Sequence, residues 1–354
     1  MEMVKSMYPL KFKPIYKEKI WGGNNLSGEF NRELPSDLIG ESWELAAHQK
    51  GVSKVANGPW AGKSIIEVID AEGAKILGNQ AAKDCYDKFP LLIKFLDAND
   101  KLSVQVHPDE KYALKEKIGD LGKTEVWYII AAQKGAKLIF GIKDGVTKAE
   151  FKKAIKEKSL RDKLVEVEVG PGDAFYIPAG TVHAIQEGIV LAEIQQNSDA
   201  TYRVYDWNRV GQDGKSRQLH IKQALEVIDF GAKNTKITPL QLEAKSYLRE
   251  ILAASNEFIV ESIELKNSFK AQLSGERFEI FQVIKGETSL VYQQGELKLK
   301  AGETILLPAQ LGEYQLKGEA KLLRSYIQNL VDFKAELKAR GCSKEDISKI
   351  AGIN

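Results

Sequence analysis

The sequence predicts a mainly β protein built from two β-barrels, with helical insertions and a short helical tail at its C-terminal end. Many short apolar segments are separated by Gly and Pro, a pattern typical of barrels and sandwiches. A weak internal repeat also relates the middle of the chain to its later part. With 354 residues, the chain is long enough for two such domains.

The first domain is expected over residues 1–235. Strands are predicted near residues 10–12 and 41–45, from 89 to about 106, beyond 124, and from 165 to about 205. A helix is predicted to begin after Ser64, because Ser64 and Glu67 form a capping-box pattern before an apolar-periodic run to Leu77. The charged segment 147–164 has helical spacing and is interpreted as an insertion between strands, and a short helix is expected near 221–228.

The second domain is expected over residues 236–330, with strands between 246 and 327. Residues 331–354 form the predicted tail. A helix is predicted over 330–339, Gly341 breaks it, and Ser343 caps a final turn or two. The sequence does not decide whether this tail docks on the protein or serves assembly.

The internal repeat relates residues 172–183 to residues 302–313. Each copy has a glycine and an acidic residue, then four mostly apolar residues and a proline in the same register. His183 ends the first copy, whereas Glu313 ends the second. Glu125 likewise has a counterpart in Glu279. We infer two related barrels, of which the first alone kept its histidine.

The charge balance excludes some classes of partner. Lys and Arg number 51 and Asp and Glu 49, which gives a formal net charge of +2 and no reason to expect a nucleic acid or a membrane. The N-terminal residues lack the apolar segment of a secretory signal, and no apolar run is long enough to span a bilayer. Cys85 and Cys342 are far apart and in no ligand or redox spacing, so two reduced thiols are expected. We expect a cytoplasmic monomer or weak homo-oligomer.

The segment 101–108 carries the most chemistry. Alternation along a strand places Leu102, Val104 and Val106 on one face. Ser103, Gln105 and His107 then share the other face, and Pro108 ends the strand. An imidazole nitrogen and an amide oxygen two residues apart can reach the same metal ion.

Glu125 and His183 complete a possible ligand set from other strands. With Gln105 and His107 they offer two nitrogens and two oxygens, which suits zinc with an open coordination position. Each residue taken alone also has a structural interpretation, because a histidine at a strand end is more often structural than a ligand. From spacing alone, the four residues predict a metal site and no particular reaction.

Two levels of family resemblance extend this prediction. Residues 172–183 resemble the second cupin motif, with a glycine–acid opening followed by Pro-x-Gly-x-x-His. Several blocks resemble the short bacterial form of the type I mannose-6-phosphate isomerases (phosphomannose isomerases) across most of residues 8–330. The most specific block is Ser-Val-Gln-Val-His-Pro, and the blocks together are residues 20–23, 40–48, 90–98, 102–108, 123–125 and 196–203.

The resemblance implies two cupin-type (jelly-roll) barrels, the second of them degenerate and without a metal. It also implies one Zn²⁺ per chain, held by the four residues named above, and a sugar phosphate as substrate. The implied reaction is the interconversion of mannose 6-phosphate and fructose 6-phosphate. Arg203 occupies the position of the family's catalytic arginine. Lys123 also matches, although Thr124 replaces the proline of many members.

Aldose–ketose isomerisation moves a proton between two carbons through an enediol(ate), which requires a base and an electrophile. As a hypothesis, Arg203 stabilises the developing charge and Lys123 takes part in substrate binding or proton transfer. Lys94 interrupts an apolar strand, so it either extends to solvent at an edge or faces the pocket, where it helps bind substrate or pairs with Glu125. Ser103 either touches substrate or is an ordinary strand serine. The base and the phosphate-binding residues are not assigned.

Two other functions are compatible with such a barrel. A metal-dependent oxygenase would use two histidines and a carboxylate to hold Fe(II). A non-catalytic sugar-binding module would keep the pocket but lose the arginine or a ligand. Gln105 as a fourth ligand argues against the first, and the presence of Arg203 with all four ligands argues against the second.

Overall fold

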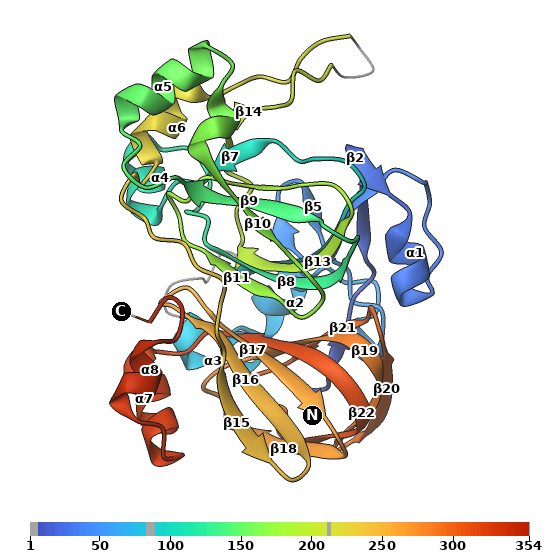
Figure 1. The fold of residues 1–354 in the computed structure, drawn as a ribbon. Coiled ribbons are helices and arrows are strands. Elements are labelled where there is room, and N and C mark those ends of the chain that lie inside the picture. The colour runs from blue at the N-terminus through green and yellow to red at the C-terminus, as the bar shows by residue number, and fades with distance from the viewer. Residues whose placement is uncertain (1–5, 83–88, 211–213, 354) are drawn as a thin grey trace. The chain divides into compact units, whose positions relative to one another are not determined.

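The computed structural model describes residues 6–82, 89–210 and 214–353 (Figure 1). Strands predominate, so the mainly β prediction is confirmed. The chain forms two compact units, each made of separate segments. Unit 1 contains Met1–Ile15, Trp43–Ile93 and Ile237–Asn354, and unit 2 contains Tyr16–Ser42 and Lys94–Lys236.

The units therefore interleave along the chain, whereas the sequence predicts contiguous domains. Hydrogen bonds inside unit 1 explain the grouping. Strand β1 (Leu10–Lys11) pairs with β21 (Thr304–Leu307). The amide of Ala309 donates to the carbonyl of Ile76 at 3.0 Å. The boundary between residues 236 and 237 lies one residue beyond the predicted domain boundary, and the domain scheme itself stays a prediction.

Two sheets make up most of the framework of unit 2. One has the order β10-β9-β12-β7-β14 and the other β11-β8-β13-β6-β3-β2. Their facing sides share an apolar core, to which β8 and β11 contribute Trp127 and Phe175, while β9 contributes Phe140. The bounds are β2 Ile15–Gly23, β3 Ile39–Leu45, β6 Leu91–Ala98, β7 Val104–Val106, β8 Glu125–Ala132, β9 Lys137–Ile142, β10 Leu164–Glu168, β11 Ala174–Ile177, β12 His183–Ile185, β13 Ile189–Gln196 and β14 Tyr202–Tyr205.

Helices cover the other side of the five-stranded sheet. Val104 and Val106 are fully buried in a second apolar cluster with residues of α5 (Lys148–Lys156) and α6 (Ile221–Val227). Both helices lie near β14 in Figure 1. The apolar face of β7 therefore packs against these helices. Gln105, on the opposite face of the strand, points between the two sheets. The predicted helices in segments 147–164 and 221–228 are confirmed.

The helix predicted from Ser64 to Leu77 is two helices. The capping box at Ser64 is present, with Glu67 accepting from the backbone N–H of Ser64. Helix α2 (Ile65–Glu72) ends at Gly73, whose φ is +51°, and α3 (Ala74–Ala82) follows. Inside α3, Gly78 has φ +81°, and a Cβ there would lie 2.4 Å from the carbonyl oxygen of Glu276. Close backbone contact in unit 1 therefore breaks the helical run.

Unit 1 contains a nine-stranded sheet with the order β1-β21-β19-β22-β17-β16-β15, to which β18 and β20 are added. The predicted repeat is confirmed in the strand pairing. Ile177 is opposite Glu125 in unit 2, and Leu307 is opposite Glu279 in unit 1. The remaining bounds are β15 Leu240–Ala244, β16 Tyr247–Ala254, β17 Ile259–Leu265, β18 Ser268–Leu273, β19 Glu279–Tyr292, β20 Gly295–Lys300 and β22 Gly312–Tyr326.

The tail forms the two predicted helices, α7 (Leu330–Ala339) and α8 (Lys344–Ser348), and docks within unit 1. Phe333 and Leu337 are fully buried in an apolar cluster with Ile251 and Ile259 of the sheet. Cys342 is half-buried and forms no disulfide within the described part of the chain, whereas Cys85 lies outside that part. The smaller elements are α1 Asn25–Phe30, α4 Glu110–Glu116, β4 Ala47–His48, β5 Gly51–Val52, η1 Gly58–Trp60 and η2 Leu160–Lys163.

None of the helices in the described ranges combines the length and apolar character needed to cross a bilayer.

Candidate metal centre and active site

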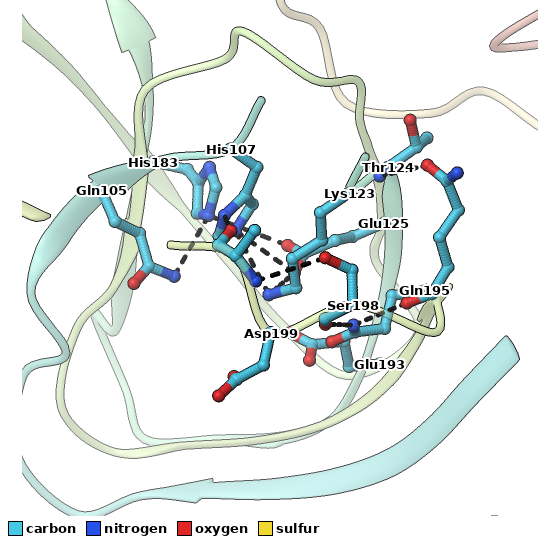
Figure 2. Close-up of polar contacts among 12 residues, drawn as sticks. Gln105, His107, Lys123, Thr124, Glu125, His183, Glu193, Gln195, Ser198 and Asp199 are labelled. Atoms are coloured by element: carbon cyan, nitrogen blue, oxygen red, sulfur yellow. Dashed lines mark hydrogen bonds and ion pairs between the residues drawn. The ribbon is translucent and has the colours of Figure 1, made fainter. Parts of the chain in front are cut away.

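Three residues predicted as metal ligands converge in unit 2 (Figure 2). His107 directly follows β7, Glu125 begins β8, and His183 begins β12. One nitrogen or oxygen atom from each lies within 4.8 Å of the others, and all three side chains are buried. Each of the three residues lies at one end of a strand, and the fold brings together residues up to 76 positions apart in the sequence.

The distances within this ligand set are close to those of a metal site. His107 Nε2 lies 3.4 Å from Glu125 Oε1, and His183 Nε2 lies 3.7 Å from Glu125 Oε2. Four ligands at about 2.0–2.2 Å from one ion in a tetrahedron are about 3.3–3.6 Å apart. Both carboxylate oxygens of Glu125 are buried, and the ammonium group of Lys123 lies 2.6 Å from Oε1, whereas Oε2 has no hydrogen-bond partner among the described residues. Such an acceptor is costly to bury unless a cation approaches it, and the donor set therefore fits Zn²⁺.

Gln105 lies directly opposite His183 in the pairing of β7 with β12. Its amide group approaches the set from that strand, with Nε2 3.3 Å from His183 Nε2. The two ends of an amide have nearly the same shape, and its oxygen is the atom that coordinates metals. Rotating the amide by half a turn presents this oxygen to the set, so Gln105 fits as the fourth ligand.

Backbone carbonyl groups orient both histidines. The Nδ1–H of His107 donates to the carbonyl oxygen of Ala200 at 2.8 Å, and the Nδ1–H of His183 donates to that of Thr181 at 2.9 Å. With Nδ1 carrying the proton, the lone pair of each Nε2 points into the ligand set. This tautomer is assigned from the hydrogen bonds.

Electrostatics keep the ligands in the protonation states that a metal requires. Burial, together with the charge of Lys123, lowers the pKa of His107 to about 4. Burial also lowers the pKa of His183. Burial by itself raises the pKa of Glu125, but the ammonium group of Lys123 holds that pKa well below its usual range. Both imidazoles are therefore neutral and the carboxylate is ionised at neutral pH.

Lys123 lies within the ligand set. Its Nζ atom is 2.6 Å from Glu125 Oε1 and 3.3 Å from His107 Nε2. The side chain is 5% exposed, so water contributes little to its stabilisation. The backbone N–H of Lys123 donates to the carbonyl oxygen of Pro108 at 3.0 Å, which fixes its loop beside His107.

Arg203 and Ser103 are neighbours beside the ligand set. Arg203 is opposite Gln105 in the pairing of β14 with β7. Its Nε–H donates to Ser103 Oγ at 3.2 Å and its Nη1–H to the carbonyl oxygen of Gln218 at 2.9 Å. Burial and the nearby Arg217 lower the pKa of Arg203, yet a guanidinium stays cationic at neutral pH. The arrangement places a half-buried positive charge next to the predicted ligand Gln105.

Lys94 is buried, with 3% of its surface exposed, which excludes a lysine that extends to solvent at an edge. Its Nζ lies 2.9 Å from Glu193 and 2.7 Å from the amide oxygen of Gln195. Burial by itself lowers the pKa of Lys94, but the negative charge of Glu193 raises this pKa above its usual value. Pairing of Lys94 with Glu125, one of the predicted alternatives, is therefore wrong. Lys94 pairs with Glu193, whereas Lys123 pairs with Glu125.

Sequence reasoning missed two buried residues of β13. Glu193 accepts from Trp127 Nε1 at 2.9 Å, and the Trp127 ring meets the His183 ring edge-on with centroids 5.2 Å apart. The side-chain amide of Gln195 donates to the carbonyl oxygens of Gln196 and Ser198 at 2.8 and 2.6 Å, just before Ala200. Polar residues in the apolar segment 189–196 were the available signal, the same signal that drew attention to Lys94.

Comparisons with known proteins agree with this geometry. Residues 9–137 match the model of the type I phosphomannose isomerase catalytic domain, and residues 250–327 match that of the mannose-6-phosphate isomerase cupin domain. The second match confirms the cupin prediction. Mannose-6-phosphate isomerase ManA of Bacillus subtilis is 41% identical over 320 residues, which cover 90% of this chain and 99% of that protein.

Other relatives support the same assignment. Mannose-6-phosphate isomerase of Streptococcus mutans is 38% identical over 90% of this chain and 98% of its own length. A crystal structure of the Bacillus subtilis mannose 6-phosphate isomerase matches with a TM-score of 0.83 and 37% identity, covering 90% of this chain and 99% of that one. The chain therefore belongs to the type I mannose-6-phosphate isomerase (phosphomannose isomerase) family and is an enzyme of that family.

Proposed function

We propose that this enzyme is a zinc-dependent aldose–ketose isomerase that interconverts mannose 6-phosphate and fructose 6-phosphate through an enediol(ate). The observation that carries the proposal is the buried set of His107, Glu125 and His183, with the amide of Gln105 beside it. The names of the relatives indicate the substrate.

The residues at the site fit the charge changes of this reaction. Zn²⁺ held by Gln105, His107, Glu125 and His183 would polarise and orient the sugar's carbonyl and hydroxyl oxygens. Arg203 is fixed by Ser103 and by the carbonyl of Gln218, so its guanidinium is preorganised to stabilise an enediolate oxygen. Water is largely excluded around the ligands, which strengthens each of these electrostatic interactions.

Three lysine and serine assignments complete the proposal. Lys123 takes part in proton transfer or substrate binding, supported by its place among the ligand atoms. Ser103 lies on the substrate side, supported by its contact with Arg203. Lys94 is assigned to substrate binding from its strand position, although Glu193 already neutralises its charge. The domain at 236–330 is proposed to be non-catalytic, and the enzyme is proposed to act in the cytoplasm.

The first experiment follows conversion of mannose 6-phosphate to fructose 6-phosphate by the purified chain. The protein is assayed as isolated, after chelation, and after zinc is added back. Loss of activity on chelation and its return with zinc would support the proposal. If the protein is inactive with zinc demonstrably bound, mannose 6-phosphate is excluded as its substrate. If the isolated protein contains iron, an oxygenase is favoured.

Two variants test the named residues. His107→Ala removes one of four ligands and is expected to weaken zinc binding at least tenfold, together with activity. Arg203→Ala is expected to lower kcat by about 10²–10³-fold, because the developing charge loses its stabilising group, while zinc stays bound. Arg161→Ala is the matched control, since Arg161 is largely exposed in the same unit and pairs with Glu166.

A further inference from the structure

Lys123 takes a place among the ligand atoms that a metal ion would share. Its Nζ lies closer to Glu125 Oε1, at 2.6 Å, than any histidine nitrogen does, and it is 3.3 Å from His107 Nε2. Figure 2 shows the ammonium group directed toward Glu125 and His107 from the loop before β8. The chain thus supplies its own cation to the ligand set.

In the metal-free protein, this cation compensates the buried negative charge of Glu125. Glu125 is 0% exposed, and an unpaired buried carboxylate is strongly unfavourable. Among the described residues, Lys123 is the lysine or arginine that forms an ion pair with Glu125. The ammonium group therefore compensates the charge of the buried carboxylate before a metal arrives.

The same position opposes the metal once it binds. A zinc ion coordinated by Glu125 Oε1 would lie about 2.0–2.2 Å from that oxygen. Because Nζ is 2.6 Å from the same oxygen, the two cations could be separated by no more than about 4.8 Å. Two positive charges at such a distance in a buried site repel each other. The backbone of Lys123 is fixed by Pro108, so the side chain is the part that can move away.

We propose that Lys123 is an internal counter-ion that stabilises the metal-free protein and competes with the metal for Glu125. Its charge lowers the affinity for the metal, and it stabilises a folded, preorganised site when no metal is bound. The inference deepens the metal-dependent function proposed above and rests on it. It concerns binding of the metal alone and is independent of the sugar phosphate.

The test compares the wild-type protein with Lys123→Met and Lys123→Arg. Met has nearly the shape of Lys without its charge, whereas Arg keeps the charge. Each protein is stripped of metal, and its zinc affinity is measured by competition with a chromophoric chelator at constant pH and salt. Thermal unfolding of the metal-free proteins is measured in parallel. Lys137→Met is the control, because Lys137 lies on the surface of the same unit and pairs with Glu166.

We expect Lys123→Met to bind zinc at least about tenfold more tightly than wild type and to unfold at a lower temperature when metal-free. Lys123→Arg and Lys137→Met should show neither the tighter binding nor the lower unfolding temperature. If metal-free Lys123→Met does not fold, zinc release from the loaded protein into excess chelator takes the place of the affinity measurement and should be at least about tenfold slower than in wild type.

Equal or weaker zinc binding by Lys123→Met, or equally fast release, would overturn the inference and leave the proposed function intact. If neither wild type nor Lys123→Met binds zinc, both proposals fail.

Discussion

Replacing Arg324 with Met removes one guanidinium from a buried ionic cluster in unit 1. Nη1 of Arg324 lies 3.1 Å from Glu261 Oε2, and Nη2 contacts Glu279. Arg249 is the second partner of Glu261, and both acids are fully buried. A pair of opposite charges 3.1 Å apart is worth about 5 kcal/mol at an effective dielectric constant of about 20.

The net cost of the substitution is smaller than the sum of two such pairs. Arg249 and the hydroxyl of Tyr326 remain with Glu261, and Arg277 and the hydroxyl of Tyr314 remain with Glu279. Removing Arg324 also relieves the desolvation of its own charge. Breaking a buried pair by deleting one partner typically costs about 3–5 kcal/mol, because the other charge stays buried. We expect Arg324→Met to lower the free energy of unfolding by that amount.

Urea unfolding followed by circular dichroism measures this loss. Arg161→Met is the control, because Arg161 is 61% exposed and its pair with Glu166 should contribute less than about 1 kcal/mol. Adding Glu279→Gln to Arg324→Met removes a buried carboxylate whose remaining ion pair is with Arg277 at 3.4 Å, and it should recover part of the stability. A loss below about 1 kcal/mol for Arg324→Met, with an unchanged denaturant slope, would refute the electrostatic argument.

Three further predictions use other features of the chain. The amide of Gln282 is buried without a hydrogen-bond partner among the described residues, so Gln282→Leu should raise the free energy of unfolding by about 1 kcal/mol; a decrease in urea unfolding would contradict this. The pKa of His107 is about 4 in the folded protein against about 6.5 unfolded, so the unfolded state binds more protons between these values. The metal-free protein should therefore keep full stability above pH 6.5 and lose on the order of 3 kcal/mol as the pH falls toward 4, and a stability independent of pH in that window would exclude the effect. Ending the chain after Gln328 removes the tail side chains that pack on Ile251 and should cost at least about 3 kcal/mol in the unfolding of unit 1, measured by calorimetry; an unchanged transition would show that the tail is dispensable for stability.

The two units treat the same carboxylate position differently. Glu125 and Glu279 occupy corresponding places in the strand pairing, opposite Ile177 and Leu307. Glu125 lies with two histidines, while Glu279 contacts the guanidinium of Arg324, a cation that belongs permanently to the chain. In the described ranges, the group that could hold a metal is the one around Glu125. Unit 1 thus satisfies its buried acid with arginine, whereas the corresponding acid of unit 2 lies with two histidines.

The sequence by itself determined the local features of this protein. Alternation around Gln105 predicted which side chains share a strand face, and capping patterns at Ser64 and Ser343 located helix starts, because these properties depend on neighbouring residues. The repeat predicted the correspondence of Glu125 with Glu279 for the same reason. Spacing alone predicted a metal site at four residues, and family resemblance added the reaction and the role of Arg203.

The tertiary structure decided what depends on residues distant in sequence. The apolar run after Ser64 is interrupted because Gly78 meets the backbone of Glu276, nearly 200 positions later. The sequence does not indicate which acidic residue pairs with Lys94. The order of the strands places Glu193 of β13 beside it. The position of Lys123 beside Glu125 follows from a loop held against Pro108. Charge pairing in a buried site depends on three-dimensional distance, which local sequence patterns do not contain.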